Sequence, residues 1–142
     1  MARRDIDDVI VYKEDNMGEK FEHGYALIIG VDENMIPRLE LPVVSKDVQA
    51  LHDVLIHPQR CGYLPENVRL LKGKLATRDN IFDSLHWLQN KASDDENATV
   101  IIYYSGHGFL DKKTGYSYLI PYDTSSLSNI RQDAIRTELF GF

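Results

Sequence analysis

Residues 98–109 read Ala98-Thr-Val-Ile-Ile-Tyr-Tyr-Ser-Gly-His-Gly-Phe109, a β-branched and aromatic run that ends at a histidine between two glycines. Residues 100–104 do not alternate between polar and apolar side chains, which predicts a strand covered on both faces at the centre of a parallel sheet. In open α/β sheets, ligands bind beyond the carboxyl ends of such strands. The pattern therefore places residues 105–108 where a substrate would bind.

The turn that follows this predicted strand holds Ser105, Gly106, His107 and Gly108. Because the two glycines carry no side chain, backbone N–H groups can approach a ligand closely there, and an irregular turn is allowed. A Gly-His-Gly turn alone carries little information, and a structural histidine is the alternative interpretation. The place of His107 directly after a buried strand favours a catalytic role.

Composition and charge limit the classes of function. The 142 residues, 43% hydrophobic and 27% charged, are typical of one soluble globular domain. The net charge of -6, without a stripe of Lys and Arg, argues against a nucleic-acid partner. No apolar run approaches the roughly 20 residues of a membrane span and no signal-peptide core is present, so we expect no membrane association. The single cysteine, Cys61, suits a reducing compartment, and we expect a cytoplasmic protein.

We expect neither a metal nor another cofactor. One cysteine excludes an internal disulfide and a multi-cysteine metal site. The polar loop at residues 93–97 has neither the glycine nor the spacing of a calcium loop, and we interpret it as solvated.

The chain divides into a charged N-terminal extension, residues 1–23, and a domain at residues 24–142. Four basic and seven acidic residues within the first 22 give -3, half of the net charge. Residues 9–12 could add an edge strand, but the charge around them favours a solvated arm or a short pro-segment.

The other elements predict a β-α-β-α-β order. Residues 25–31 form a second buried parallel strand, and residues 67–71 a short third one. Ser45 is the expected N-cap of a helix to about His57, with an apolar face of Val48, Leu51, Val54 and Leu55. Thr77 caps a second helix whose apolar stripe is Ile81, Phe82, Leu85 and Leu88.

Beyond His107 we expect a hairpin and the start of a helix. Residues 116–120 alternate and return across a turn at residues 112–115, while Thr137 is the expected N-cap of a further helix. The sequence stops in the first turn of that helix, at Phe142. A doubly wound sheet normally continues, so we expect an incomplete domain.

Several motifs together resemble the caspase-like cysteine peptidases, and among them the metacaspase-type branch. They are Tyr25-Ala-Leu-Ile-Ile-Gly-Val31, Lys46-Asp47-Val48, Gly62-Tyr63, Asn67-Val-Arg-Leu-Leu71, Ala76-Thr77, Tyr104-Ser-Gly-His-Gly108 and Tyr118-Leu-Ile-Pro-Tyr-Asp123. The resemblance covers the chain from about Tyr25 to its end. It implies a three-layer α/β/α fold with a mainly parallel central sheet, incomplete in this chain.

The resemblance also implies a role for each residue of the turn. His107 works with a cysteine thiolate, the N–H of Gly108 helps to form the oxyanion hole, and Ser105 and Gly106 shape the loop beside the substrate. This chemistry needs a thiolate to attack the peptide carbonyl, a histidine to protonate the leaving amine, and N–H donors for the developing charge. The substrate is a protein or peptide.

In metacaspase-type members the acid matching Asp47 lines the specificity pocket, which implies cleavage after Arg or Lys. The alternative is that Asp47 only complements the positive end of the helix dipole in the first turn. True caspases instead hold an aspartate through an arginine ahead of this helix. Residues 39–44 contain none, and Arg38 lies early.

The departure from the family lies in the nucleophile. Caspases place it about 50 residues after the histidine, beyond Phe142. Cys61 precedes His107, and we interpret it as incidental; the other histidines, at positions 23, 52, 57 and 86, match no motif. We favour an active peptidase whose cysteine lies in the remainder of the catalytic domain, on the same or a separate chain. The alternatives are a caspase-like pseudoenzyme or assembly module and, last, an unrelated anion-binding α/β domain.

Overall fold

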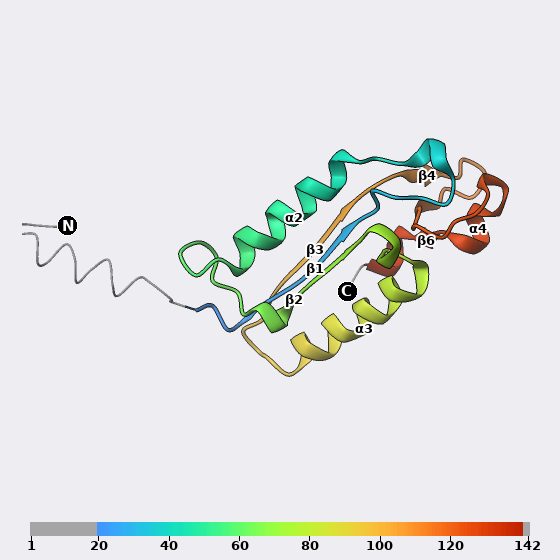
Figure 1. Cartoon of the computed structure of the whole chain (residues 1–142). Helices are drawn as coiled ribbons and strands as arrows, with labels where there is room; N and C mark the ends of the chain where they lie inside the picture. The colour runs from blue at the N-terminus through green and yellow to red at the C-terminus, as the bar shows by residue number, and fades with distance from the viewer. Residues whose placement is uncertain (1–19, 141–142) are drawn as a thin grey trace, which may run out of the picture.

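Strand β1 (Gly24–Gly30) forms the middle of the main sheet in the computed structural model, which describes residues 20–140. β2 (Val68–Lys72) and β3 (Thr99–Ser105) pair with its two edges, both parallel to it. Figure 1 shows the three strands side by side. The expected edge strand or arm at residues 9–12 lies outside the described residues.

Side chains of β1 alternate between two apolar clusters, one on each face of the sheet. Leu27 and Ile29 point toward α3 (Arg78–Ser93), whereas Ala26 and Ile28 point toward α2 (Val43–Ile56). All seven residues of β1 are buried, because each face of the strand is covered by a helix. Figure 1 shows α2 and α3 on opposite faces, which confirms the predicted α/β/α layers.

β3 lies at an edge of the described sheet, and its predicted central position, which needs a further strand on its other side, stays a prediction. It pairs with β1 alone, and the side chains of Val100 and Tyr103 are each 39% exposed. Its other apolar residues face the helices, with Ile101 against the α2 cluster and Ile102 against the α3 cluster. The apolar run of β3 reflects these helix contacts on both faces of the strand.

Helix α2 begins three residues earlier than expected, at Val43, with Pro42 in the N-cap position. Proline suits a helix start because its φ is already helical and its missing N–H would have no partner there. Ser45 is therefore not the N-cap, and its hydroxyl accepts from Lys72 Nζ at 3.4 Å. Val54 is 46% exposed, so the predicted apolar face is wrong at that position.

Helix α3 follows its prediction closely. The hydroxyl of Thr77 accepts from the N–H of Asn80 at 3.2 Å and caps the first turn. Three residues of the expected apolar stripe are buried, namely Ile81, Leu85 and Leu88. The fourth, Phe82, is partly buried and packs beside them. Among residues 20–140, no helix is long and apolar enough to cross a membrane.

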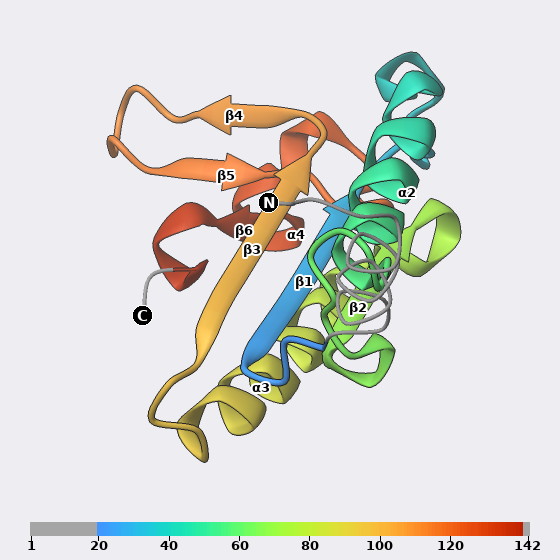
Figure 2. The ribbon, with the colours of Figure 1, turned by 90° about the vertical axis from the view of Figure 1, so that its left-hand side faces the viewer.

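A second, antiparallel sheet lies past the carboxyl end of β3. It joins β4 (Gly108–Leu110), β5 (Ser117–Leu119) and β6 (Ile135–Arg136) in that order. Figure 2 shows β4 and β5 as a hairpin beyond the tip of β3. Gly115 turns the hairpin with a φ of 80°, a conformation that favours glycine, as the turn prediction required.

The last described elements are short. α4 (Ile130–Asp133) precedes β6, and Thr137 opens a 3-10 turn, Thr137–Phe140, instead of capping an α-helix. Residues 141 and 142 lie outside the described residues.

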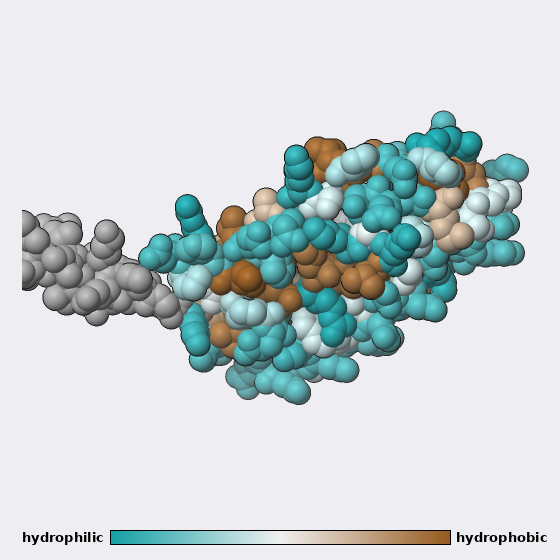
Figure 3. All heavy atoms as spheres, in the orientation of Figure 1, coloured by the Kyte–Doolittle hydropathy of each residue, from teal (hydrophilic) through white to brown (hydrophobic). Residues whose placement is uncertain are grey.

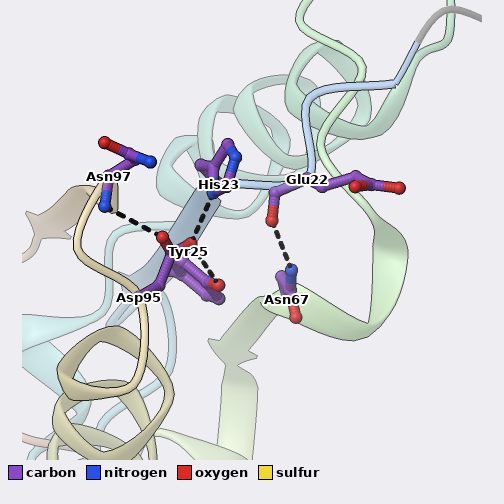
Figure 4. A network of polar contacts seen from close by, with 6 residues as sticks. All are labelled: Glu22, His23, Tyr25, Asn67, Asp95 and Asn97. Carbon is purple, nitrogen blue, oxygen red and sulfur yellow. Dashed lines mark hydrogen bonds and ion pairs between the residues drawn. The ribbon is translucent and has the colours of Figure 1, made fainter.

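A polar network at the amino end of the sheet ties β1 to the loop before β3 (Figure 4). Asp95 accepts from the Tyr25 hydroxyl at 2.8 Å and from the N–H of Asn97 at 2.9 Å, and pairs with His23 Nδ1 at 2.7 Å. The Asp95 side chain is only 13% exposed. The other residues of the loop at 93–97 are exposed, as expected for a solvated loop, and Asp95 anchors it to β1.

Candidate active site

The turn that carries His107 lies between β3 and β4, at the carboxyl end of the main sheet. Two backbone bonds fix it: Val31 N–H donates to the Ser105 carbonyl at 2.9 Å, and Ile120 N–H donates to the His107 carbonyl at 3.0 Å. The turn is thus held between the end of β1 and the strand that returns from the hairpin. Its position is the one at which parallel α/β sheets bind ligands.

The imidazole of His107 is half-buried, and its Nε2 atom is buried without a hydrogen-bond partner among the described residues. A buried polar atom without a partner costs free energy, because the bond that it would make to water is lost. A folded protein tolerates such a cost chiefly where the group has another use. This ring is therefore the strongest candidate for chemistry in the turn.

Gly106 is required by close packing and not by an irregular backbone. Neither it nor Gly108 has a positive φ, so the bend at Gly106 does not depend on the left-handed backbone conformation that favours glycine. A Cβ at Gly106 would lie 2.8 Å from the Tyr104 hydroxyl and 3.1 Å from Val31 Cβ. The glycine makes room for a protein side chain on this side of the histidine.

The N–H of Gly108 points away from the hairpin. Gly108 lies opposite Leu119 in the hairpin. The next pair, His107 and Ile120, is hydrogen-bonded, because the Ile120 N–H donates to the His107 carbonyl. Opposed residues of antiparallel strands alternate between bonded and non-bonded pairs, so the Gly108 N–H turns outward. β4 has no second neighbour in the described sheet, which leaves this donor directed at the edge beside His107.

Comparison with known families gives one result. The model of the caspase domain matches residues 23–141. The chain belongs to the caspase-domain family. Membership indicates a cysteine peptidase, whose substrates are proteins, and it agrees with the layered α/β fold. No match was found among the curated proteins.

Asp47 of this caspase domain is exposed on α2, at the same end of the sheet as His107. The residue after it, Val48, packs on Gly30, where an added Cβ would lie 2.7 Å from Val48 Cγ2. Because α2 begins at Val43, Asp47 falls beyond the first turn. The helix dipole acts mainly within the first turn, so this alternative interpretation of Asp47 loses its support.

Cys61 lies at the opposite end of the caspase domain's sheet. It is exposed in the loop between α2 and β2, and the neighbouring Gly62 accepts from Phe21 N–H at 2.8 Å, just before β1. Seven residues of strand span about 20 Å, so β1 separates Cys61 from His107. A thiol at this distance cannot act on a substrate held at His107.

The remaining histidines lie away from the turn. His23 pairs with Asp95, His52 Nδ1 lies 3.0 Å from Asp53, and the ring of His57 accepts from Gln59 N–H at 3.0 Å. His86 is exposed on α3. The described residues contain no group of three or more His, Cys, Asp and Glu side chains placed to hold a metal ion.

Sequence reasoning missed two residues that shape this site. The hydroxyl of Tyr104 donates to the carbonyls of His107 and Ile120, at 3.0 and 3.1 Å. Asn34, buried in the loop after β1, donates to the Pro121 carbonyl at 3.2 Å. The only available signal was a polar group within an apolar run or loop, which does not reveal its partner.

Arg38, the arginine weighed as an alternative specificity residue, is exposed in the turn Pro37–Leu39.

Proposed function

We propose that this chain is the histidine-bearing part of a cysteine endopeptidase with a Cys-His dyad. His107 is the proton-transferring member, and the nucleophilic cysteine lies outside these 142 residues. The observation that carries the proposal is the buried, unpartnered Nε2 of His107 beside the outward N–H of Gly108. Family membership supplies the reaction class.

The geometry supports a two-step hydrolysis. The thiolate attacks the peptide carbonyl, and the N–H of Gly108 donates to the oxygen as negative charge develops there. The imidazolium of His107 gives its proton to the amine nitrogen as the carbon–nitrogen bond breaks. Water then attacks the thioester, His107 takes its proton, and the carboxylic acid leaves as the thiolate reforms.

A basic residue before the cleaved bond fits this site best. Asp47 presents a carboxylate near the carboxyl end of β1. A carboxylate attracts Arg or Lys and repels Asp or Glu. Arg38 lies outside α2, in the turn Pro37–Leu39, and residues 39–44 contain no arginine that could hold an acidic substrate. We therefore assign a metacaspase-type preference, with Ser105 and Gly106 beside the bound peptide.

The partner that completes the site is the remainder of the catalytic domain, on the same or a separate chain. The free edge of β3 and an apolar groove lined by Leu88, Ala92 and Val100 lie along one side. A parallel strand added there ends at the same edge of the sheet as β3, which brings a following cysteine beside His107. The face in Figure 3 instead shows apolar atoms between α2 and α3, where the other edge strand, β2, lies.

The single cysteine, exposed and distant from His107, also suits a reducing compartment, and we propose a cytoplasmic location.

The test compares residues 1–142 alone with the complete peptidase, using an Arg-containing reporter peptide and a thiol-reactive Arg probe. We expect hydrolysis only from the complete protein, and its loss in His107→Ala. His86→Ala, an exposed histidine on α3, and Cys61→Ala are the controls and should retain activity. Turnover by a folded His107→Ala variant, or probe labelling at Cys61 that abolishes activity, would overturn the dyad.

The second candidate is a caspase-like pseudoenzyme or assembly module. It is favoured by one observation, that the sole cysteine is at the wrong end of the sheet. This alternative would be established if residues 1–142 bind the remainder of the catalytic domain at the β3 edge but the complex never reacts with the Arg probe.

A further inference from the structure

The hydroxyl of Tyr104 is directed into the turn that carries His107. It donates to the His107 carbonyl at 3.0 Å and to the Ile120 carbonyl at 3.1 Å. The Ile120 N–H donates to the same His107 carbonyl at 3.0 Å. One side chain on β3 thus links the main sheet, the histidine turn and the segment after β5.

Two features show that this contact is built into the fold. The missing side chain of Gly106 leaves the space that the Tyr104 hydroxyl occupies, since a Cβ there would lie 2.8 Å away. Burial raises the pKa of the Tyr104 phenol well above its usual range. The hydroxyl therefore stays protonated and remains a donor at every pH at which a peptidase works.

We propose that Tyr104 is the positioning residue for His107. This inference deepens the proposed function and rests on it for its catalytic consequence. The His107 carbonyl and the Gly108 N–H lie in one peptide plane. By holding that carbonyl, Tyr104 fixes the direction of the Gly108 N–H and the backbone that carries the imidazole. The alternative is an ordinary buried tyrosine whose hydrogen bond contributes only to the stability of the fold.

The test replaces Tyr104 by Phe in the complete peptidase, which removes the hydroxyl and keeps the ring. We expect kcat to fall about 10- to 100-fold, because a displacement near 1 Å of a catalytic group has that cost. KM should change less than about twofold, since Tyr104 does not touch the substrate. The matched control is Tyr25→Phe, which removes another buried tyrosine hydrogen bond, to Asp95, at the far end of the sheet.

A second measurement is independent of hydrolysis. The imidazole C–H signals of His107, followed by NMR in the complete protein, should shift in Tyr104→Phe and stay unchanged in Tyr25→Phe. In a peptidase that requires His107, a Tyr104→Phe kcat equal to that of Tyr25→Phe overturns the proposal. If His107→Ala remains active, the proposed function fails on its own, and the NMR signals alone decide whether Tyr104 positions the ring.

Discussion

The side-chain amide of Asn34 donates to the carbonyl oxygen of Pro121 across 3.2 Å, and its own oxygen accepts from Ile36 N–H at 2.8 Å. This buried residue joins the loop after β1 to the segment after β5. A parallel bond, from Met35 N–H to the Tyr122 carbonyl at 2.9 Å, reinforces the junction. The two loops that border the His107 turn are thus one connected unit.

Asn34→Ala should lower the free energy of unfolding by about 1–3 kcal/mol, because it leaves buried groups of the two loops without partners. Urea unfolding of the complete protein measures the loss. The matched control is Asn90→Ala on the exposed surface of α3, which should change stability by less than about 0.5 kcal/mol. Equal effects of the two substitutions would show that the junction adds nothing.

Gly106→Ala should be more damaging than Gly108→Ala. The new methyl group at residue 106 meets the Tyr104 hydroxyl at 2.8 Å, whereas at residue 108 the nearest atom, the Tyr118 carbonyl oxygen, is 3.4 Å away. Overpacking of this kind costs about 1–3 kcal/mol. Unfolding midpoints of the two variants provide the measurement. A Gly108→Ala variant that is the less stable of the two would contradict the packing argument.

Asp47→Asn should lower kcat/KM for substrates with Arg before the cleaved bond by roughly 10- to 100-fold, because the amide keeps an acceptor oxygen but loses the negative charge that strengthens its bond to the guanidinium. Peptide-library profiling of the complete peptidase gives the result. Asp53→Asn, an exposed carboxylate on the same helix, is the control. A wild-type preference for Asp at that position would instead remove Asp47 from the specificity site.

Stability should fall in acid partly through the network of Figure 4. The hydrogen bonds from His23 and Tyr25 hold the pKa of Asp95 below its usual value. A lowered folded-state pKa means that the native state binds fewer protons than the unfolded chain. Its stabilisation is therefore complete above pH ~4 and is lost as the pH falls through the folded-state pKa.

Asp95→Asn should accordingly flatten the dependence of the unfolding midpoint on pH below about pH 4. The control is Asp94→Asn, which replaces the neighbouring exposed carboxylate, and Asp95→Asn should flatten the slope more than this control does. Identical slopes for the wild type and Asp95→Asn would show that this carboxylate does not contribute.

Local patterns predicted the elements that depend on neighbours in the sequence. The apolar run of β1, the Thr77 cap and the Gly115 hairpin each follow from contacts within a few residues. The start of α2 was misplaced because Pro42 provides a competing signal just before Ser45. The apolar run of β3 predicts that helices cover both faces of the strand, but it does not reveal which strands pair with its edges.

The candidate site divides in the same way. His107 and Gly108 are found from their place after a buried strand. The contact of Tyr104 with Ile120 spans 16 residues and depends on how the hairpin returns, which no local pattern encodes. Asn34 meets Pro121 across 87 residues for the same reason.

The alternation along β1 gives the domain its cooperativity. Leu27 belongs to one apolar cluster and Ile28 to the other, so neither cluster can open without disturbing the strand that both share. Amide protons of β1 should therefore exchange with solvent only through unfolding of the whole domain, whereas those of the exposed hairpin exchange by local opening. The protection of this one strand then reports the global stability of the fold, including any gain from a partner at the β3 edge.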